Sequence, residues 1–329
     1  MIMEKDGPPP IYTVKVYHGY GHTNNCTVFG HVFAGATNMR NYDRSNTWQN
    51  IVHLVRLFLL RPKAGVPVRL TWNQQQFHTT TAADGFFTFN WSSDHSIPAG
   101  WHSVVVDALS EEGLIINSGT GKLFVPHLTQ LAIISDIDDT VLVSHSSTIL
   151  KRLILLFTLN PQSRQAFAGI MELYKWLAEA RTEDDTPNPF FYVSSSEWNL
   201  YDDLVDFFRF NHLPEGSFLL NQVKRWYDLL KTGKTKHQGK LLRIVCIVEA
   251  FPHQQFILLG DNSQSDPFIY RTIAEKYGDR IVAVFIRSVV PKHDPDTQVI
   301  LKEISKKGIS TQLFKDSHTA LVHAKIMFG

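Results

Sequence analysis

Apolar and polar residues alternate in short runs along the first third of the chain. Alternation with a period of two is typical of strands that bury one face, and Gly, Pro and Asp residues separate the runs. The alternating apolar positions are Tyr12, Val14 and Val16; Val66, Val68, Leu70 and Trp72; Phe87, Phe89 and Trp91; and Val104, Val106 and Ala108. We therefore predict that residues 1–128 form a smaller, mainly-β domain that resembles a sandwich or barrel.

One segment of this domain follows a helical period instead. Its apolar residues fall on one face of a helix: Trp48, Ile51, Val52, Val55, Phe58 and Leu59. The polar residues 45–47 offer capping oxygens before the segment, and Pro62 follows it. This pattern predicts one helix inserted among the strands.

From residue 129 onward, strand-like apolar runs alternate with helical patterns. This order is typical of an α/β domain with a doubly wound parallel sheet. We expect strands near 131–136, 189–194, 217–220, 256–261, 281–287 and 311–314, and helices at 163–180, 199–211, 240–250 and 267–277. Residues 129–329 are therefore predicted to form a second domain, in which residues 182–189 make a polar surface connector.

Two carboxylates stand at the end of the first strand of this second domain. The run Leu131–Ser135 leads directly into Asp136-Ile137-Asp138-Asp139-Thr140. Because strand side chains alternate, Asp136 and Asp138 point into the same crevice. Such a pair can hold a divalent cation and place two acids at one reacting centre. The pattern alone is equally compatible with an ordinary Asp-rich turn.

Later strands of the same domain also end in polar residues. Ser194 follows the run Phe190–Val193, and Asp261 follows Phe256–Gly260, with a further acid at Asp266. Ligands of open α/β sheets bind outside the carboxyl ends of the strands. Asp136, Ser194 and Asp261 are therefore predicted neighbours despite their distance in the sequence. Lys240 lies between Ser194 and Asp261 in the sequence, in a stretch rich in Lys and Arg.

The order Asp-x-Asp, Ser, Lys, Gly-Asp-(x)4-Asp resembles the haloacid dehalogenase (HAD) superfamily. The stretches Phe191–Tyr201 and Leu259–Tyr270 resemble one branch of it, the actin-patch-associated phosphatidate phosphatase catalytic-domain family, as does the opening Val16–Gly21. The chain departs from that family at Glu197, Asn262-Ser263 and Gly239, where proline, Ser-Gly and histidine are expected. The resemblance implies a HAD-like fold for the α/β domain.

The resemblance also implies a role for each polar residue at the strand ends. Asp136 would be the nucleophile that forms an aspartyl-phosphate, and Asp138 would be the general acid and base. Thr140 would orient Asp138 and, together with Ser194 and Lys240, bind phosphate. The metal site would hold Mg²⁺ through Asp136, Asp138, Asp261 and Asp266. Asp139 receives no role.

Asp266 has a second interpretation that is purely structural. It precedes Pro267, which is the pattern of an N-cap followed by a proline in the first turn, and Gly278 would end that helix. One carboxylate can serve both the helix and a metal, so the structural role does not exclude the metal-binding role that the resemblance implies.

The function implied by the resemblance is Mg²⁺-dependent hydrolysis of phosphatidate to diacylglycerol through the aspartyl-phosphate. Two alternatives stay open. The same chemistry could act on a soluble or protein-borne phosphomonoester, because fold and motif do not select the substrate. The chain could also be a non-catalytic module that binds a membrane or a partner, although the intact set of polar residues favours an enzyme.

Composition narrows the remaining classes. The 329 residues suit two domains, and 43% hydrophobic with 19% charged residues is typical of a globular protein. A net charge of +1 gives no general attraction to nucleic acid, so no nucleic-acid partner is expected. Cys26 and Cys246 form neither a metal spacing nor a disulfide framework, which suits the cytoplasm. Cys246 follows Leu242 and Val245 on a helical pattern, so we expect a buried structural thiol.

Membrane contact is expected to be peripheral. The chain begins without the apolar segment of a signal peptide, and no run reaches the roughly 18 apolar residues of a membrane span. The most apolar segment, Ile149–Leu159, follows the acid motif and carries Lys151 and Arg152. We interpret it first as a packed helix or a dimer interface, with lipid contact beside the site as the alternative. The sequence does not define an oligomeric state.

Overall fold

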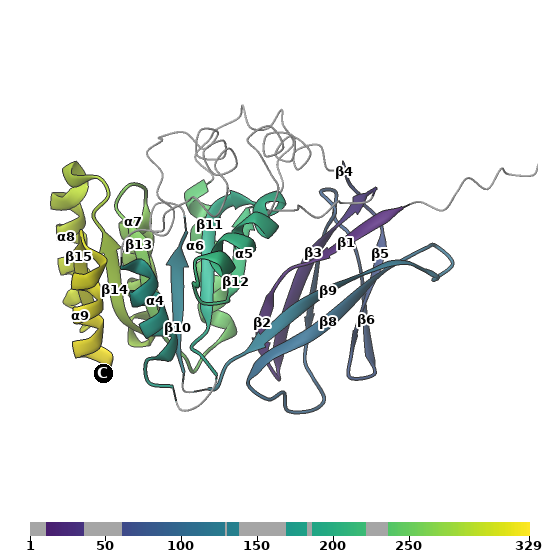
Figure 1. The fold of residues 1–329 in the computed structure, drawn as a ribbon, viewed down its shortest axis with the longest axis horizontal. Helices are drawn as coiled ribbons and strands as arrows, with labels where there is room; N and C mark the ends of the chain where they lie inside the picture. The colour runs from purple at the N-terminus through teal and green to yellow at the C-terminus, as the bar shows by residue number, and fades with distance from the viewer. Residues whose placement is uncertain (1–10, 36–60, 129, 138–168, 183–185, 222–235) are drawn as a thin grey trace, which may run out of the picture. The chain divides into compact units, whose positions relative to one another are not determined.

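The computed structural model describes residues 11–35, 61–128, 130–137, 169–182, 186–221 and 236–329. The chain divides into two compact units (Figure 1). The first comprises Met1–Asn41 and Val55–Val125, and the second comprises Tyr42–Leu54 and Pro126–Gly329. The predicted boundary at residues 128/129 stays a prediction. The predicted inserted helix, the residues Asp138, Asp139 and Thr140, and the apolar segment Ile149–Leu159 lie outside the described residues.

The first unit consists of strands, as predicted. They are β1 (Tyr12–Val16), β2 (Gly19–His22), β3 (Asn25–Ala34), β4 (Arg61–Pro62), β5 (Pro67–Trp72), β6 (Gln75–Thr80), β7 (Phe86–Trp91), β8 (Gly100–Leu109) and β9 (Ile115–Val125). Their order is β1-β3-β2-β9-β8-β5-β6, with β4 and β7 also paired to β3. The long strand β3 pairs with β7 along its first half and with β1 along its second half. It therefore connects strands on both sides of the core.

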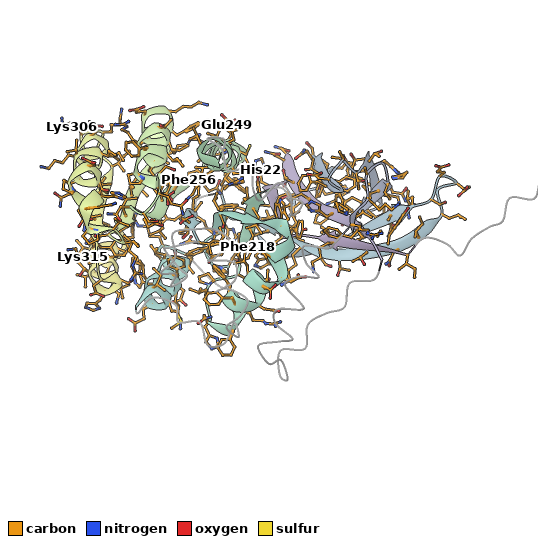
Figure 2. All side chains as sticks on the ribbon, turned by 90° about the horizontal axis from the view of Figure 1, so that it is seen from above. His22, Phe218, Glu249, Phe256, Lys306 and Lys315 are labelled. Carbon is orange, nitrogen blue, oxygen red and sulfur yellow. The ribbon has the colours of Figure 1, made fainter. Side chains whose placement is uncertain are left out.

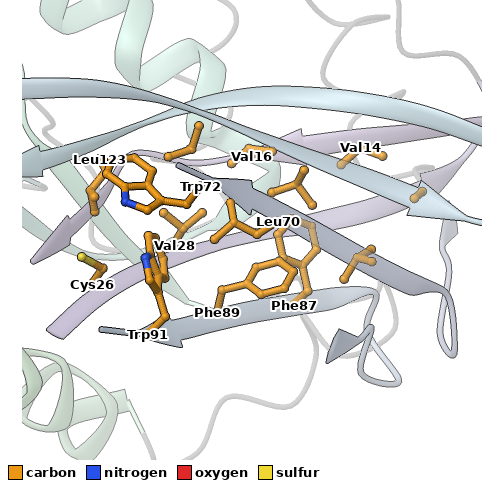
Figure 3. Packing of buried hydrophobic residues seen from close by; sticks show 14 of the residues in the cluster. Val14, Val16, Cys26, Val28, Leu70, Trp72, Phe87, Phe89, Trp91 and Leu123 are labelled. Carbon is orange, nitrogen blue, oxygen red and sulfur yellow. The ribbon is translucent and has the colours of Figure 1, made fainter. Parts of the chain in front are cut away.

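The core of the first unit contains the apolar positions that the alternation predicted. All of them are buried except Tyr12, which is partly buried and packs against the others. Figure 3 shows several of these side chains, among them Leu70, Phe89 and Trp91, packed together between the strands. The ring centroids of Trp72 and Trp91 are 5.8 Å apart. Cys26 also lies in this core, where burial raises the pKa of its thiol to about 12. This cysteine therefore acts as a small apolar side chain.

His31 on β3 is a buried titratable group in the same unit. Its Nδ1 lies 3.0 Å from the Tyr17 hydroxyl, and its ring stacks on Phe33 with centroids 5.5 Å apart. Burial lowers the pKa of His31 to about 4, although the charge of Asp84 acts in the opposite direction. The imidazole is consequently neutral in the folded protein near pH 7.

We expect the first unit to lose stability in mild acid through His31. Because the folded pKa lies below the unfolded value of about 6.5, the unfolded chain gains protons first, and stability falls as the pH drops from 6.5 toward 4. The loss at pH 5 is about 2 kcal/mol. Urea unfolding of the full chain at pH 7 and pH 5 measures it, with His31→Gln as the non-titrating control. An identical loss in wild type and variant would contradict this assignment.

The second unit contains a parallel sheet of six strands, which confirms the predicted α/β class. The strands are β10 (Leu131–Asp136), β11 (Phe190–Glu197), β12 (Ser217–Asn221), β13 (Gln255–Asp261), β14 (Ile281–Arg287) and β15 (Ser310–Phe314). Their order in the sheet is β12-β11-β10-β13-β14-β15. Each lies close to a range expected from an apolar run, because strands covered on both faces are apolar almost throughout.

Helices cover both faces of this sheet. They are α4 (Ile170–Glu179), α5 (Tyr201–Phe210), α6 (Lys236–Ala250), α7 (Asp266–Tyr277), α8 (Asp294–Ser305) and α9 (Ser317–Phe328). Surface ion pairs join α6 to α7 (Glu249 to Lys276, 3.2 Å) and α7 to α8 (Arg271 to Glu303, 3.1 Å). In Figure 2, Glu249 of α6 lies on the same side of Phe256, a residue of the sheet, as Lys306, which directly follows α8. No helix in the described ranges is long and apolar enough to cross a membrane.

Three sequence-based expectations about this unit were wrong. Cys246 is exposed, because the buried face of α6 carries Ile244, Ile247 and Val248 while Leu242 points outward at 62% exposure. Asp266 is the first residue of α7 rather than its N-cap, which is Ser265.

The third wrong expectation concerns the connector before β11. Asn188 is buried there, and its side-chain amide donates to the carbonyls of Leu177 (2.8 Å) and Ala180 (2.7 Å). The amide thereby satisfies carbonyls at the end of α4 that have no partner within the helix.

Candidate functional site

The chain reverses its direction across the sheet between β10 and β13. After β10 it builds β11 and β12 on one side, and then it returns to build β13 on the other side of β10. The carboxyl ends of these two neighbouring strands therefore lie at the reversal point of the sheet, where open α/β sheets bind their ligands. Asp136 is the last residue of β10, and Asp261 is the last residue of β13.

A third carboxylate joins these two at the start of α7. Asp136, Asp261 and Asp266 are all buried, and one oxygen from each lies within 4.8 Å of the others. Gly260 makes room for this approach, because a Cβ at that position would lie 2.5 Å from Asp266 Oδ2. The glycine before Asp261 is thus required by packing against Asp266.

Lys240 on α6 brings a positive charge into the cluster. Its Nζ donates to Asp136 Oδ1 at 2.7 Å and also to Asp266 Oδ1. Burial would lower the pKa of Lys240, but the two carboxylates outweigh this effect and raise it above its usual value. The side chain is therefore a fixed cation between two acids.

Backbone amides donate to two further carboxylate oxygens of the cluster. The amide of Ser263 donates to Asp261 Oδ1 at 2.5 Å, and the amide of Asp261 donates to Asp266 Oδ2 at 3.3 Å. The pKa of Asp266 is nevertheless raised to about 7, because burial and the charge of Asp136 exceed the opposing effects of Lys240 and the amide. The cluster is thus crowded with negative charge.

The arrangement suits a metal ion chemically. Three carboxylates offer hard oxygen donors, which are the ligands that Mg²⁺ and Ca²⁺ prefer. Arg287, the partner of Asp261 in the β13–β14 register, is a further cation at this edge. The three acidic side chains outnumber the two cations Lys240 and Arg287, and a bound cation would favour the ionised form of Asp266. The cluster could therefore hold a metal.

The remaining predicted residues are placed as follows. Ser194 is buried on β11, one residue beyond Val193, which is the register partner of Asp136. It therefore lies at the same edge of the sheet as the cluster. Asp138 and Thr140 lie outside the described residues. The structure thus brings together Asp136, Asp261, Asp266 and Lys240 and places Ser194 on the strand beside them.

Two supporting interactions were missed by the sequence analysis. Arg243 donates to the backbone carbonyl of Ser194 at 3.2 Å, and its position three residues after Lys240 on one helix was the available signal. Ser135 donates to the carbonyl of Asp136 at 2.9 Å and contacts the Tyr174 hydroxyl. No local sequence pattern connects Tyr174 on α4 with the end of β10.

Comparisons with known proteins agree with this location. Residues 131–288 match the family described as "Phosphatidate phosphatase APP1, catalytic domain". The chain is similar to phosphatidate phosphatase APP1 of Saccharomyces cerevisiae, with 29% identity over 174 residues, 50% of this chain and 28% of that protein. It is also similar to an uncharacterized protein of Schizosaccharomyces pombe, with 23% identity over 228 residues, 65% of this chain and 35% of that protein. The chain thus spans about a third of the length of these relatives.

Among solved structures, the likeness is weak. An immunoglobulin-like domain of the M. primoryensis ice-binding adhesin has a TM-score of 0.17 and 16% identity, over 32% of this chain and 78% of that one. A score of this size carries no argument. The class of the first unit rests instead on its own strand order and core.

Proposed function

Residues 131–288 belong to the catalytic-domain family of phosphatidate phosphatase APP1, and from this premise we propose that the chain is a Mg²⁺-dependent phosphatase. Its substrate would be a phosphomonoester, namely phosphatidate, and the lipid product would be diacylglycerol. The observation that carries the proposal is the convergence of Asp136, Asp261, Asp266 and Lys240 at the strand ends of the matched region.

The proposed reaction begins with Asp136. Its carboxylate oxygen forms a bond to phosphorus while the bond from phosphorus to the substrate oxygen breaks, which leaves an aspartyl-phosphate. The departing oxygen receives a proton from Asp138. In the second half, Asp138 takes a proton from a water molecule that attacks phosphorus, and inorganic phosphate leaves while Asp136 is regenerated.

Neighbouring groups would hold the transferred phosphate. Lys240 supplies a point charge, and Ser194 and Thr140 supply hydroxyl donors toward the phosphate oxygens. Asp136, Asp261 and Asp266, together with the backbone carbonyl of Asp138, would hold Mg²⁺. When bound, this ion would neutralise charge on the phosphate oxygens.

We expect the full chain to release inorganic phosphate from an aryl phosphate only when Mg²⁺ is present. Excess chelator should abolish the release, and added Mg²⁺ should restore it, because the carboxylate cluster lacks sufficient positive charge of its own. A colorimetric phosphate assay measures this. Phosphate release at an undiminished rate in chelator would contradict the proposed metal dependence. No release under any condition would favour a non-catalytic binding module.

The same assay on a lipid panel tests the substrate. Phosphatidate in vesicles or detergent should be hydrolysed with a higher kcat/KM than glycerol phosphate, a sugar phosphate or a phosphopeptide. Preference for one of the water-soluble esters would instead identify the chain as a phosphatase of soluble or protein-borne substrates.

A further inference from the structure

Asn262, the residue directly after Asp261, uses every polar atom it has. It is buried, and its Oδ1 accepts from the amides of Val289 (2.8 Å) and Val290 (2.9 Å). Its Nδ2 donates to the carbonyl of Val290 (3.1 Å) and to Asp294 Oδ1 (2.7 Å). Its own amide donates to the carbonyl of Arg287 at 3.0 Å. The residue therefore connects the end of β13 to the segment that follows β14.

That segment is tied down on its far side as well. Nδ1 of His293 donates to the carbonyl of Asn262 at 2.7 Å, and Ser288 Oγ donates to Asp294 Oδ1 at 2.7 Å. Thr297 on α8 in turn donates to the carbonyl of His293 at 2.8 Å. Residues 288–293, which we call the β14–α8 loop, are thus anchored to Asn262 at one end and to the first turn of α8 at the other.

The side-chain amide is suited to this position by its chemistry. Two backbone amides require an acceptor from it, while a carbonyl and the Asp294 carboxylate require a donor. A side-chain amide carries a hydrogen-bond acceptor and a donor together. A carboxylate has no donor, so its oxygen would face the carbonyl and the Asp294 carboxylate, which are also acceptors. An apolar side chain of similar size would leave these buried backbone groups without a partner.

Asn262 also belongs to the turn by which the chain leaves β13 after Asp261. Asp261 is the last residue of β13, and its Oδ1 accepts from the amide of Ser263 at 2.5 Å. Asn262 lies between these two residues. A shift of Asn262 would therefore move Ser263 and turn the Asp261 carboxylate away from Asp136 and Asp266. Groups that orient a ligand in this way influence metal affinity almost as strongly as the ligands.

We propose that Asn262 is a positioning residue for the metal centre, which clamps the β14–α8 loop to the Asp261 turn and thereby fixes the Asp261 carboxylate for binding a divalent cation. The inference rests on the proposed function insofar as that function includes a metal at Asp136, Asp261 and Asp266. It adds that the bonds from Asn262 to Asp294 and to Val289 and Val290 set the affinity of this site.

The test measures Mg²⁺ binding directly by isothermal titration calorimetry on the full chain, without substrate. Asn262→Leu removes all four side-chain hydrogen bonds at nearly constant size and charge, and it should raise the Kd for Mg²⁺ about 10- to 100-fold. Asn262→Ser keeps one short acceptor and should give a smaller increase. This second variant keeps the test decisive if Asn262→Leu does not fold.

Asn188→Leu is the matched control. Asn188 is equally buried and also donates to two acceptors, but it lies before β11, at the edge of the sheet opposite to the carboxyl ends. The Asn188→Leu substitution should lower Tm while leaving the Kd for Mg²⁺ unchanged.

The outcomes separate the inference from the proposed function. An unchanged Kd in Asn262→Leu or Asn262→Ser, with a lowered Tm, would reduce Asn262 to a purely structural residue and overturn the inference alone. An equal rise of Kd in Asn188→Leu would overturn it too, because a general loss of stability would then explain the effect. Absence of Mg²⁺ binding by the wild-type chain would overturn the proposed metal centre together with the inference.

Discussion

Asp136→Asn is expected to abolish phosphate release, with kcat lowered about 10⁴-fold or more, while the fold persists. The amide has the shape of the carboxylate, and its oxygen can still accept from Lys240, which lies 2.7 Å from Asp136 Oδ1. It cannot, however, act as the nucleophile of the proposed covalent step. Steady-state phosphate release and thermal unfolding, measured on the same preparation, check both halves of this expectation.

A buried aspartate in the first unit provides the control. Asp107 is 7% exposed and pairs with Arg69 at 2.8 Å. Asp107→Asn should therefore lower the unfolding temperature without lowering kcat. Near-wild-type turnover by Asp136→Asn would refute the covalent mechanism.

Lys240→Met should cause the second large effect, on stability. The variant leaves Asp136 and Asp266 buried without the cation that both carboxylates contact. Removing one partner of a buried ion pair typically costs about 3–5 kcal/mol. Because Mg²⁺ would bind the same carboxylates in the folded protein only, its addition should restore part of the lost stability. Denaturant unfolding with and without Mg²⁺ measures both quantities.

The matched lysine for this experiment is Lys276. It also forms an ion pair, with Glu249 at 3.2 Å, but its side chain is 61% exposed. Lys276→Met should leave the unfolding midpoint nearly unchanged, because solvent screens exposed pairs. A similarly small effect of Lys240→Met would mean that the cluster does not depend on this lysine.

The parallel sheet was predictable from the sequence because its strands are buried on both faces. A run such as Phe256–Leu259 is apolar throughout, so it needs no partner to be recognised as a strand. β9 shows the opposite case. Its sequence contains Gly119 and Gly121, and a Cβ at Gly119 would lie 2.2 Å from the carbonyl oxygen of Val14. The pairing of β9 with β2 and β8 defines this strand, and the local sequence does not indicate it.

The errors on α6 and α7 have a related physical cause. Residues 241–248 of α6 are apolar on more than one face, so the sequence could not decide whether Leu242 or Ile244 would be buried. Asp266 was given an N-cap role beside the metal-binding one, because the local sequence contains no sign of its contact with Lys240. Its carboxylate instead accepts hydrogen bonds from Lys240 and from the amide of Asp261. In each case the outcome depends on residues that are distant in the sequence.

The strand order also has a consequence for the time at which the centre can form. Lys240 and Asp136 are 104 residues apart in the chain. The strand β10 also pairs with β13, so this pairing cannot form until β13 has been synthesised. Contacts between such distant residues are slow to form, because a long loop must close before any of them stabilises the chain. A ribosome therefore has to release α6, β13 and the start of α7 before the three carboxylates can meet. Acquisition of cation affinity would consequently mark a late step in the maturation of a nascent chain.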